Sequence, residues 1–539
     1  MLVTILCSFG LLLAFQSCFQ HVFAHPPINE RHDKQPNIIF IITDDQDLHM
    51  NSIEYMPNVQ KHIRDQGTTY TRHFCTVALC CPSRVSLLTG KAAHNTNVTD
   101  VSPLTVWFIA RGYPKFVTQG LNDAYLPVWL QDAGYNTYYT GKIFNSYTVS
   151  NWNKPYLKGW NSSDILLDPN TYRYWNATFG RNQDEPVNYE GQYNTDLVAS
   201  KALGLLAEAA NASNGKPFFL GIAPIAPHTD TTISPDGIFF APPEPAPKYK
   251  DYFRDVRIPR TPNFNPEKVS GASYIRHLTR INSTVIDYYD EFYRLRLRAL
   301  QSVDEMVGTL FSQLAEFDLL DNTYVVYTAD NGYHIGQHRL PAGKSCGYEE
   351  DIGVPFALRG PGVPHNFTAD LVTTHTDIAA TFLSIAGASD LSPYSFDGLP
   401  IPLTAAEIEE AKRTRAEHVN VEYWGAHFGE GHYAGPSHHN NTYKAVRVLG
   451  PEYNLYYAVW CTNEHELYDL SVDPGQLRNL YHDANATLAI LDGTHSLSGL
   501  EARLDALLLV LKSSAPSMPL NSMFDKPPNL ATEPNDCAF

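Results

Sequence analysis

Cysteine is scarce in this chain: there are eight in 539 residues, and two of the eight fall within the first 24 residues. The remaining six are too few for a disulfide-stapled scaffold, and their spacing matches no zinc finger or zinc ribbon. Disulfide pairing stays open, with Cys461 and Cys537 as one option. The unusual feature is an adjacent pair, Cys80 and Cys81.

Basic residues are also in short supply. The 39 Lys and Arg are outnumbered by 57 Asp and Glu, which gives a formal net charge of −18. Such an acidic protein is not expected to bind nucleic acid. A small anionic substrate is still compatible, because a local group of cations can outweigh distant charge. After the first 24 residues no apolar run is long enough to cross a bilayer, so no membrane span is expected in the mature chain.

The N-terminus, residues 1–24, has an apolar middle and ends in small residues, which is typical of a secretory signal peptide. No Lys or Arg precedes its apolar part, which leaves an N-terminal membrane anchor as the alternative. The expected location is secreted, in the cell wall or periplasmic space, or in a lysosome- or vacuole-like compartment. Eight N-x-S/T sequons support export and predict a glycoprotein modified at Asn97, Asn161, Asn176, Asn211, Asn282, Asn366, Asn440 and Asn485.

Strand-like and helix-like segments alternate along most of the chain. Continuous apolar runs, typical of strands buried on both faces of a parallel sheet, occur at residues 38–43, 218–223, 324–328 and 356–358. Helical apolar spacing occurs at residues 293–319 and, after a Thr-Asp start signal, at 376–386. This order predicts an α/β fold with a mostly parallel central sheet flanked by helices.

The composition changes near residues 393–402. Beyond this point, short β-like runs at 443–448 and 453–460 precede a helix at 497–512, which predicts a smaller C-terminal α+β subdomain. The expected organisation is a signal peptide at 1–24, a catalytic α/β domain at 25–395, the C-terminal subdomain at 396–512 and an extended tail at 513–539.

Acidic side chains stand directly after two of the predicted strands. Asp44 and Asp45 follow the run at 38–43, and Asp330 and Asn331 follow the run at 324–328. Ligands of open α/β sheets bind just past the carboxyl ends of strands, where such residues can converge. Three carboxylates and one amide oxygen suit calcium or magnesium rather than zinc or copper. The alternative is that both pairs only form turns.

A second candidate site begins at Cys80. Pro82 follows two residues later, and an apolar helical pattern continues through Val85, Leu87 and Leu88. This pattern predicts that Cys80 projects from the first turn of a helix, at the positive end of its dipole. A thiolate there would be a nucleophile, and the alternative is a small buried apolar side chain.

Several motifs resemble those of one enzyme family. Residues 80–90, CCPSRVSLLTG, resemble the sulfatase signature C-x-P-S-R-x-x-x-L-T-G, and residues 134–142, GYNTYYTGK, resemble its second signature G-Y-x-T-x-x-x-G-K. The CCPSR form and the GYHIGQ run at 332–337 are most similar to N-acetylglucosamine-6-sulfatase and to fungal arylsulfatases. The resemblance covers about residues 36–510, with further matches at 43–46, 226–228, 328–332, Lys344 and 466–470.

The resemblance implies an alkaline-phosphatase-like fold and an arylsulfatase-type sulfuric ester hydrolase. In this family the first signature cysteine, here Cys80, is converted to formylglycine by dedicated maturation machinery, and its gem-diol forms a covalent sulfoenzyme. The implied substrate is a small sulfate ester or a sulfated glycan. The resemblance also implies a role for each site residue. One calcium ion would be bound by Asp44, Asp45, Asp330, Asn331 and the modified Cys80. Arg84 would orient the diol, Lys142 and Lys344 would hold sulfate oxygens, and His228 would protonate the leaving oxygen.

One position departs from the family pattern. Many arylsulfatases carry a histidine shortly after the signature lysine as the base of the second step, whereas this chain has Asn145, which cannot act as a base at neutral pH. His334 is a candidate for this base by position alone. The natural substrate stays open between aryl sulfates and sugar sulfates such as N-acetylglucosamine 6-sulfate. Residues 425–439, rich in His and Gly, are predicted to line the mouth of the site or to form an ordinary surface loop.

Two other functions are alternatives to a sulfatase. A phosphatase or phosphodiesterase of the same superfamily would use Ser or Thr as nucleophile, and the cysteine at position 80 argues against it. A non-catalytic glycan-binding relative would have lost charged site residues, and none of the metal or cationic positions is lost here.

Overall fold

The computed structural model describes residues 34–101, 111–234, 237–481, 483, 488 and 496–513. Four predicted features lie outside the described residues: the signal peptide, the sequon at Asn485, Cys537 and the tail after Ser513. In the part of the chain that is described, no helix is both long enough and apolar enough to cross a membrane.

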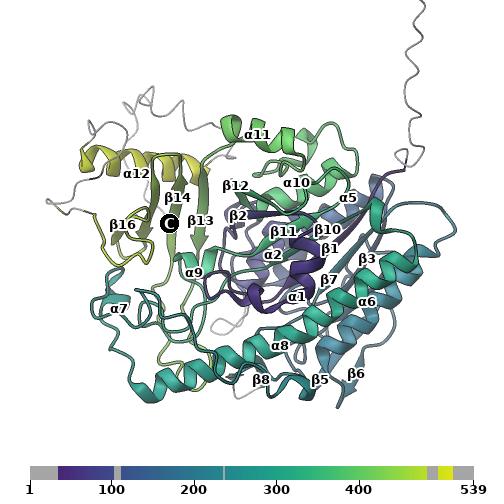
Figure 1. Cartoon of the computed structure of the whole chain (residues 1–539), viewed down its shortest axis with the longest axis horizontal. Helices are drawn as coiled ribbons and strands as arrows, with labels where there is room; N and C mark the ends of the chain where they lie inside the picture. The colour runs from purple at the N-terminus through teal and green to yellow at the C-terminus, as the bar shows by residue number, and fades with distance from the viewer. Residues whose placement is uncertain are drawn as a thin grey trace, which may run out of the picture. The chain divides into compact units, whose positions relative to one another are not determined.

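The core of the unit that begins at Pro36 is a ten-stranded sheet (Figure 1). Its central strands pair in parallel, while β11, β5 and β6 pair only antiparallel. The fold is therefore α/β with a mostly parallel central sheet, as predicted. The order across the sheet is β12 (Phe367–Thr374), β2 (Thr68–Phe74), β11 (Phe356–Arg359), β10 (Thr323–Ala329), β1 (Asn37–Thr43), β7 (Phe218–Ala223), β3 (Asn136–Gly141), β4 (Ser162–Leu166), β5 (Asn176–Arg181) and β6 (Val187–Glu190).

Strand β1 shows why the sequences of the predicted strands are continuous apolar runs. Every residue of β1 is buried, because side chains alternate between two hydrophobic cores. Ile38 and Phe40 pack in the core formed with α2 (Cys80–Thr89) and α10 (Thr376–Ile385). Ile39 and Ile41 pack in the core formed with α6 (Asn194–Ala210) and α8 (Ser283–Glu316). Figure 1 shows α6 and α8 side by side over this second face.

The predicted helix at 293–319 is confirmed as α8, but it begins ten residues earlier, at Ser283. The reason is a capping residue: the side chain of Asn282 accepts a hydrogen bond from the N–H of Val285. The first two turns of α8 are partly exposed, at Ser283, Thr284 and Asp287, while Val285 and Ile286 pack against a core cluster.

A four-stranded antiparallel sheet follows in the C-terminal part, which confirms a smaller α+β subdomain. Its strands are β13 (His418–Tyr423), β14 (Tyr443–Leu449), β15 (Asn454–Trp460) and β16 (His465–Asp469). Helix α12 (Leu497–Ser513) lies beside this sheet (Figure 1). Its leucines pack in one cluster with apolar side chains of β14 and β15. The runs at 443–448 and 453–460 are thus strands as predicted, whereas β13 and β16 were not anticipated.

Glu466 in β16 is a fully buried carboxyl group, and burial raises its pKa to about 7. Tyr348 donates a hydrogen bond of 3.2 Å to one oxygen, and the other oxygen has no hydrogen-bond partner. Folded Glu466 therefore binds a proton more tightly than unfolded Glu466, whose pKa is near 4.5. Its contribution to stability must fall as the pH rises from about 4.5 to about 7, by roughly 3 kcal/mol. We expect Glu466→Gln to unfold at a higher temperature than the parent protein above pH 7 and to lose this advantage near pH 4.5.

Glu464→Gln is the matched control. Burial raises the pKa of Glu464, but hydrogen bonds from Thr462 and Ser273 outweigh this effect and the net pKa is lowered. This carboxylate stabilises the fold above its unfolded pKa, so Glu464→Gln should be less stable than the parent at pH 8. Thermal unfolding across pH 4–8 tests both variants, and parallel curves for Glu466→Gln and the parent protein would contradict the prediction.

Candidate active site

The two predicted acidic pairs meet at one edge of the sheet. Strands β1 and β10 pair in parallel with Thr43 opposite Ala329, so the residues after each strand lie side by side. Asp45 has a φ of 64°, a left-handed conformation that turns its N–H toward Asp330 Oδ1 at 3.0 Å. Asn331 donates through Nδ2 to Asp45 Oδ1 at 2.8 Å. The side chains of Asp44, Asp45, Asp330 and Asn331 are all buried.

Cys80 is the first residue of α2, as predicted, and its side chain reaches the acidic cluster. Its sulfur lies 3.6 Å from Asp44 Oδ1. Burial raises the pKa of the Cys80 thiol well above its ordinary value, so residue 80 would be a poor thiolate nucleophile at neutral pH. The side chain of the neighbouring Cys81 packs in the hydrophobic core formed with β1 and α10.

Three cations face the carboxylates. Arg84 donates from Nε to Asp330 Oδ2 at 2.8 Å and from one terminal nitrogen to the carbonyl of Lys142 at 2.6 Å. The Lys142 ammonium lies 2.5 Å from Asp44 Oδ2, and the Lys344 ammonium pairs with Asp45. Lys142 follows β3 directly, which places it beside the end of β7 and β1. These contacts unite all the predicted sulfate-binding residues at one site.

The charges perturb one another strongly. Burial, and then the neighbouring Asp330, raise the pKa of Asp44. Burial also acts to raise the pKa of Asp330, but Arg84 and Lys142 outweigh it and the net pKa is lowered. For Lys142 and Lys344, burial acts to lower the pKa, but the facing carboxylates raise it above the ordinary lysine value. Both ammonium groups therefore stay charged at neutral pH and can bind an anion.

The donor set fits a hard divalent cation. Ligand atoms of Asp44, Asp45, Cys80 and His228 lie within 4.8 Å of one another. Asn331 Oδ1 is a buried acceptor without a hydrogen-bond partner, and it belongs to the residue that already binds Asp45. Carboxylate and amide oxygens are preferred ligands of calcium and magnesium. An unpaired buried amide oxygen is costly unless a cation or donor binds it.

His228 enters the site from the segment after β7. Its Nδ1 is 2.8 Å from the backbone oxygen of Thr229, and its Nε2 is 3.6 Å from Asp45 Oδ2. Sequence reasoning missed the residue that holds it. The ring of Tyr172 stacks on the His228 ring with centroids 4.3 Å apart and an interplanar angle of 27°. No motif signals Tyr172, which lies in the loop between β4 and β5.

A cavity of about 570 Å³ opens over Cys80, and His228 and Lys344 also line it. The predicted mouth segment 425–439 contributes to the wall, through Gly425, Ala426, Phe428, Gly429, Glu430, Ala434, Ser437 and His439. Asn145 lines the cavity as well. His334 is not among its described lining residues: it is buried behind the site, with Nδ1 2.6 Å from Asp351 Oδ1. The structure thus gives no support to His334 as the missing base.

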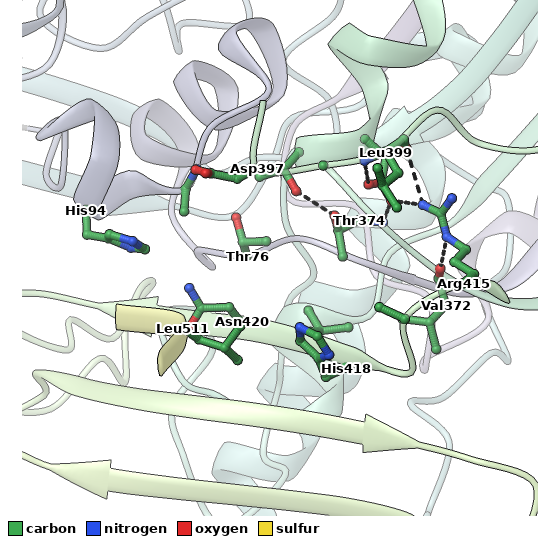
Figure 2. A pocket seen from close by; sticks show the side chains of 16 residues that line it. Thr76, His94, Val372, Thr374, Asp397, Leu399, Arg415, His418, Asn420 and Leu511 are labelled. Carbon is green, nitrogen blue, oxygen red and sulfur yellow. Dashed lines mark hydrogen bonds and ion pairs between the residues drawn. The ribbon is translucent and has the colours of Figure 1, made fainter. Parts of the chain in front are cut away.

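A smaller cavity of about 60 Å³ lies between the loops after β12 and strand β13, with Thr76, His94, His418 and Asn420 around it (Figure 2). Each of these four side chains has a buried polar atom without a hydrogen-bond partner. None of its described lining residues also lines the cavity at Cys80. We therefore assign it no part in the chemistry.

The predicted glycosylation sites differ in accessibility. Asn176 is half-buried at the start of β5, and Asn485 lies outside the described residues. The remaining sequon asparagines are exposed: Asn97, Asn161, Asn211, Asn282, Asn366 and Asn440.

Comparison with known proteins shows the family to which the chain belongs. Residues 36–388 match the family model Sulfatase, and residues 336–501 match the model N-sulphoglucosamine sulphohydrolase, C-terminal. An arylsulfatase of Volvox carteri is 41% identical over 509 residues, which cover 89% of this chain and 74% of the relative. The N-acetylglucosamine-6-sulfatase of Homo sapiens is 33% identical, with 83% of this chain and 81% of the relative covered.

The fold has solved counterparts too. A structure determined in complex with its substrate, D-glucosamine-2-N,6-O-disulfate, superposes with a TM-score of 0.65 at 22% identity, over 93% of this chain and 100% of that one. The fold and the site define a hydrolase with an alkaline-phosphatase-like core. The chain belongs to the sulfatase family and is a sulfuric ester hydrolase.

Proposed function

We propose that this sulfatase hydrolyses sulfate monoesters through a formylglycine at position 80, with one calcium ion held by Asp44, Asp45, Asp330 and Asn331 and by residue 80. The observation that carries the proposal is the convergence of Cys80, three buried carboxylates and three cations at one sheet edge. A fluorogenic aryl sulfate and the matching aryl phosphate, each with and without chelator, test it. Turnover of the phosphate in preference to the sulfate would overturn it.

Residue 80 carries a thiol in the structure, and its sulfur stands in for the oxygens of a hydrated formylglycine. When formed, that group supplies one hydroxyl that attacks sulfur and a second whose deprotonation releases sulfate. Calcium, when bound, would neutralise charge on the sulfate and lower the pKa of the diol. Cys80 is only 2% exposed, which supports conversion by the maturation machinery before the chain folds.

The chain's own cations would hold the substrate. Lys142 and Lys344 are buried ammonium groups beside the carboxylates, and Lys344 also lines the cavity. Both are suited to bind sulfate oxygens as point charges. Arg84 is fixed by Asp330 and by the Lys142 carbonyl, and its remaining terminal nitrogen lies 3.9 Å from Asp44 Oδ1 without a hydrogen bond. That nitrogen is available to orient the oxygens of residue 80.

His228 is the general acid of this proposal. Its Nδ1 faces a backbone carbonyl, which favours a proton on that nitrogen and leaves Nε2 to exchange a proton at the site. Nε2 faces the cluster at Asp45 and Cys80, where the departing oxygen would lie. Proton transfer to that oxygen matters most when the leaving alcohol is strongly basic.

The alcohol portion of the substrate would occupy the cavity above Cys80. One side of the cavity is apolar and comes mainly from the hairpin of β8 (Asp230–Ser234) and β9 (Gly237–Ala241), through Ile233, Ile238, Phe240 and also Phe428. Such a wall suits the face of an aryl or pyranose ring. Activity on a panel of aryl sulfates and sulfated sugars, including N-acetylglucosamine 6-sulfate, would identify the natural class.

The wider assignments are also proposals. The predicted signal peptide at 1–24 and the six exposed sequons support a secreted glycoprotein. The catalytic domain is proposed to span residues 25–395 and the C-terminal subdomain residues 396–512, followed by a tail at 513–539. The sheet of β13 to β16, together with α12, supports the assignment of the C-terminal subdomain.

His228→Ala is expected to slow poor leaving groups more than good ones. The loss should be on the order of 10²–10⁴ for an alkyl or sugar sulfate and clearly smaller for nitrophenyl sulfate, because nitrophenolate leaves without a proton. Steady-state rates on both substrates measure the ratio. Asp304→Asn, a change to a buried carboxylate that accepts hydrogen bonds from Asn58 and Val59, is the control and should leave the ratio unchanged. Equal losses on the two substrates would mean that His228 binds sulfate instead.

A further inference from the structure

Tyr172 contacts two of the residues to which the proposed chemistry gives a role. One is His228, whose ring stacks on the tyrosine ring at 4.3 Å. The other is Lys142, whose ammonium nitrogen lies 4.7 Å from the centroid of the same ring. Lys142 follows β3 and His228 follows the neighbouring β7, so one aromatic ring bridges the ends of two paired strands.

The loop that carries Tyr172 is held rigidly. Asn194, the buried first residue of α6, donates from Nδ2 to the carbonyls on both sides of Tyr172, those of Thr171 at 3.2 Å and Arg173 at 3.1 Å. The hydroxyl of Tyr174 donates to the carbonyl of His228 at 2.8 Å. The ring of Tyr172 is therefore fixed against the same segment that carries His228.

The hydroxyl end of Tyr172 is fixed as well. Asn145 donates from Nδ2 to the Tyr172 oxygen at 2.5 Å. Burial raises the pKa of Tyr172 well above its ordinary value, so the phenol is neutral and its ring face keeps the partial negative charge that attracts a cation. Asn145 stands near the position where many arylsulfatases carry a histidine base, and in this chain its contact is with Tyr172.

We propose that Tyr172 is a positioning residue, whose ring orients the His228 imidazole toward the leaving oxygen and the Lys142 ammonium toward the sulfate. This inference rests on the proposed function, because it takes the roles of His228 and Lys142 from it. Stacking restricts rotation of the imidazole, so Nε2 stays directed at the cluster, where it lies 3.6 Å from Asp45 Oδ2. A general acid displaced by about 1 Å loses much of its effect.

The test uses the full-length matured protein, with the aldehyde content of each variant measured first. Rates are recorded on a series of substituted phenyl sulfates, from nitrophenyl to methoxyphenyl. Tyr172→Leu removes the ring face, and we expect about a ten-fold greater loss on methoxyphenyl sulfate than on nitrophenyl sulfate, in the direction of a missing general acid. KM should rise several-fold on every member, because Lys142 loses its aromatic contact. Tyr172→Phe keeps the ring and should stay within about three-fold of the parent.

Controls separate positioning from general destabilisation. Tyr125→Leu removes another fully buried tyrosine, whose ring packs on Phe116 and Trp160, and should leave the leaving-group dependence unchanged. The double variant Tyr172→Leu/His228→Ala should show the dependence of His228→Ala alone, because Tyr172 acts through that histidine. If Tyr172→Leu does not fold, Tyr172→Met, which fills similar space without a ring, carries the same expectation.

Two failures are distinguishable. In the first, His228→Ala shows a steep leaving-group dependence, whereas Tyr172→Leu keeps the parental dependence and the parental KM. This result would overturn the positioning role and leave the proposed function intact. A flat dependence in His228→Ala itself would overturn the acid role and with it the basis of the inference. An equal steepening in Tyr125→Leu, or in Tyr172→Phe, would also overturn the assignment to the Tyr172 ring.

Discussion

Cys80→Ala is expected to abolish sulfatase activity, and Cys81→Ala is expected to retain most of it. The difference follows from where the two neighbouring side chains point. Cys80 begins α2 and faces Asp44 at 3.6 Å, within the cluster of carboxylates and cations. Cys81 is packed among the apolar residues of the core, where loss of one sulfur mainly costs packing. Initial rates with an aryl sulfate, normalised to folded protein, measure both effects.

Cys80→Ser provides a sharper test of the mechanism. A serine hydroxyl can accept the sulfuryl group, but a serine sulfate has no second hydroxyl through which to release it. We therefore expect a stable sulfated protein and no turnover, with a mass increase on the peptide that contains residue 80. Cys81→Ser, the matched control, should turn over many times and carry no sulfate.

Peptide mass spectrometry of the parent protein completes this prediction. The spacing to Pro82 and Arg84 is that of the maturation motif only when it is counted from Cys80, so an aldehyde is expected at position 80 and none at position 81. An unmodified Cys80 in fully active protein would refute the formylglycine mechanism. Burial raises the pKa of the Cys80 thiol, which is a further reason why the unmodified residue should be inert.

Calcium removal is expected to stop turnover and to lower the unfolding temperature. Asp44, Asp45 and Asp330 lie together with their side chains buried, and burial together with Asp330 raises the pKa of Asp44, so a bound cation should favour the ionised form. Free calcium at 100 times its Kd would stabilise the fold by about 2.7 kcal/mol, a contribution that a chelator removes. Asp44→Ala and Asp330→Ala should be inactive, and their unfolding temperature should no longer respond to calcium.

Differential scanning calorimetry with and without chelator, on the parent and on both variants, measures this contribution. Asp304→Ala is the control: it removes a buried carboxylate outside the site, so it should be destabilised yet still respond to calcium. Magnesium in place of calcium tests the choice of ion. Full activity after dialysis against excess chelator would contradict the metal site altogether.

The acidic site could be anticipated from local sequence because of the geometry of parallel sheets. Asp44-Asp45 and Asp330-Asn331 each follow a run of buried residues, and strands that pair in parallel end at the same edge. The pairing of Thr43 with Ala329 is sufficient to bring those residues together. The predicted strands at 218–223 and 324–328 agree within a residue or two with β7 and β10, because strands buried on both faces are continuous apolar runs.

Other features could not be anticipated from local pattern. The short strands β4, β5 and β6 carry many polar residues, because they lie toward one edge of the sheet and are less uniformly apolar than β1. The early start of α8 depends on one capping side chain, Asn282. Position along the chain made His334 a candidate base, and only the structure shows that its ring contacts Asp351 in the interior.

The sequence by itself determined the family and the alternation of strands and helices, and it supplied the candidates for the reacting and metal-binding residues, because each of these is encoded in contiguous residues. Only the tertiary structure decided how those residues are held. Tyr172 stacks on His228 and Lys142 lies over its ring, although the three come from separate loops and no periodicity connects them. Asn145 bonds this tyrosine for the same reason. Such contacts arise from the packing of distant segments, which a local pattern does not encode.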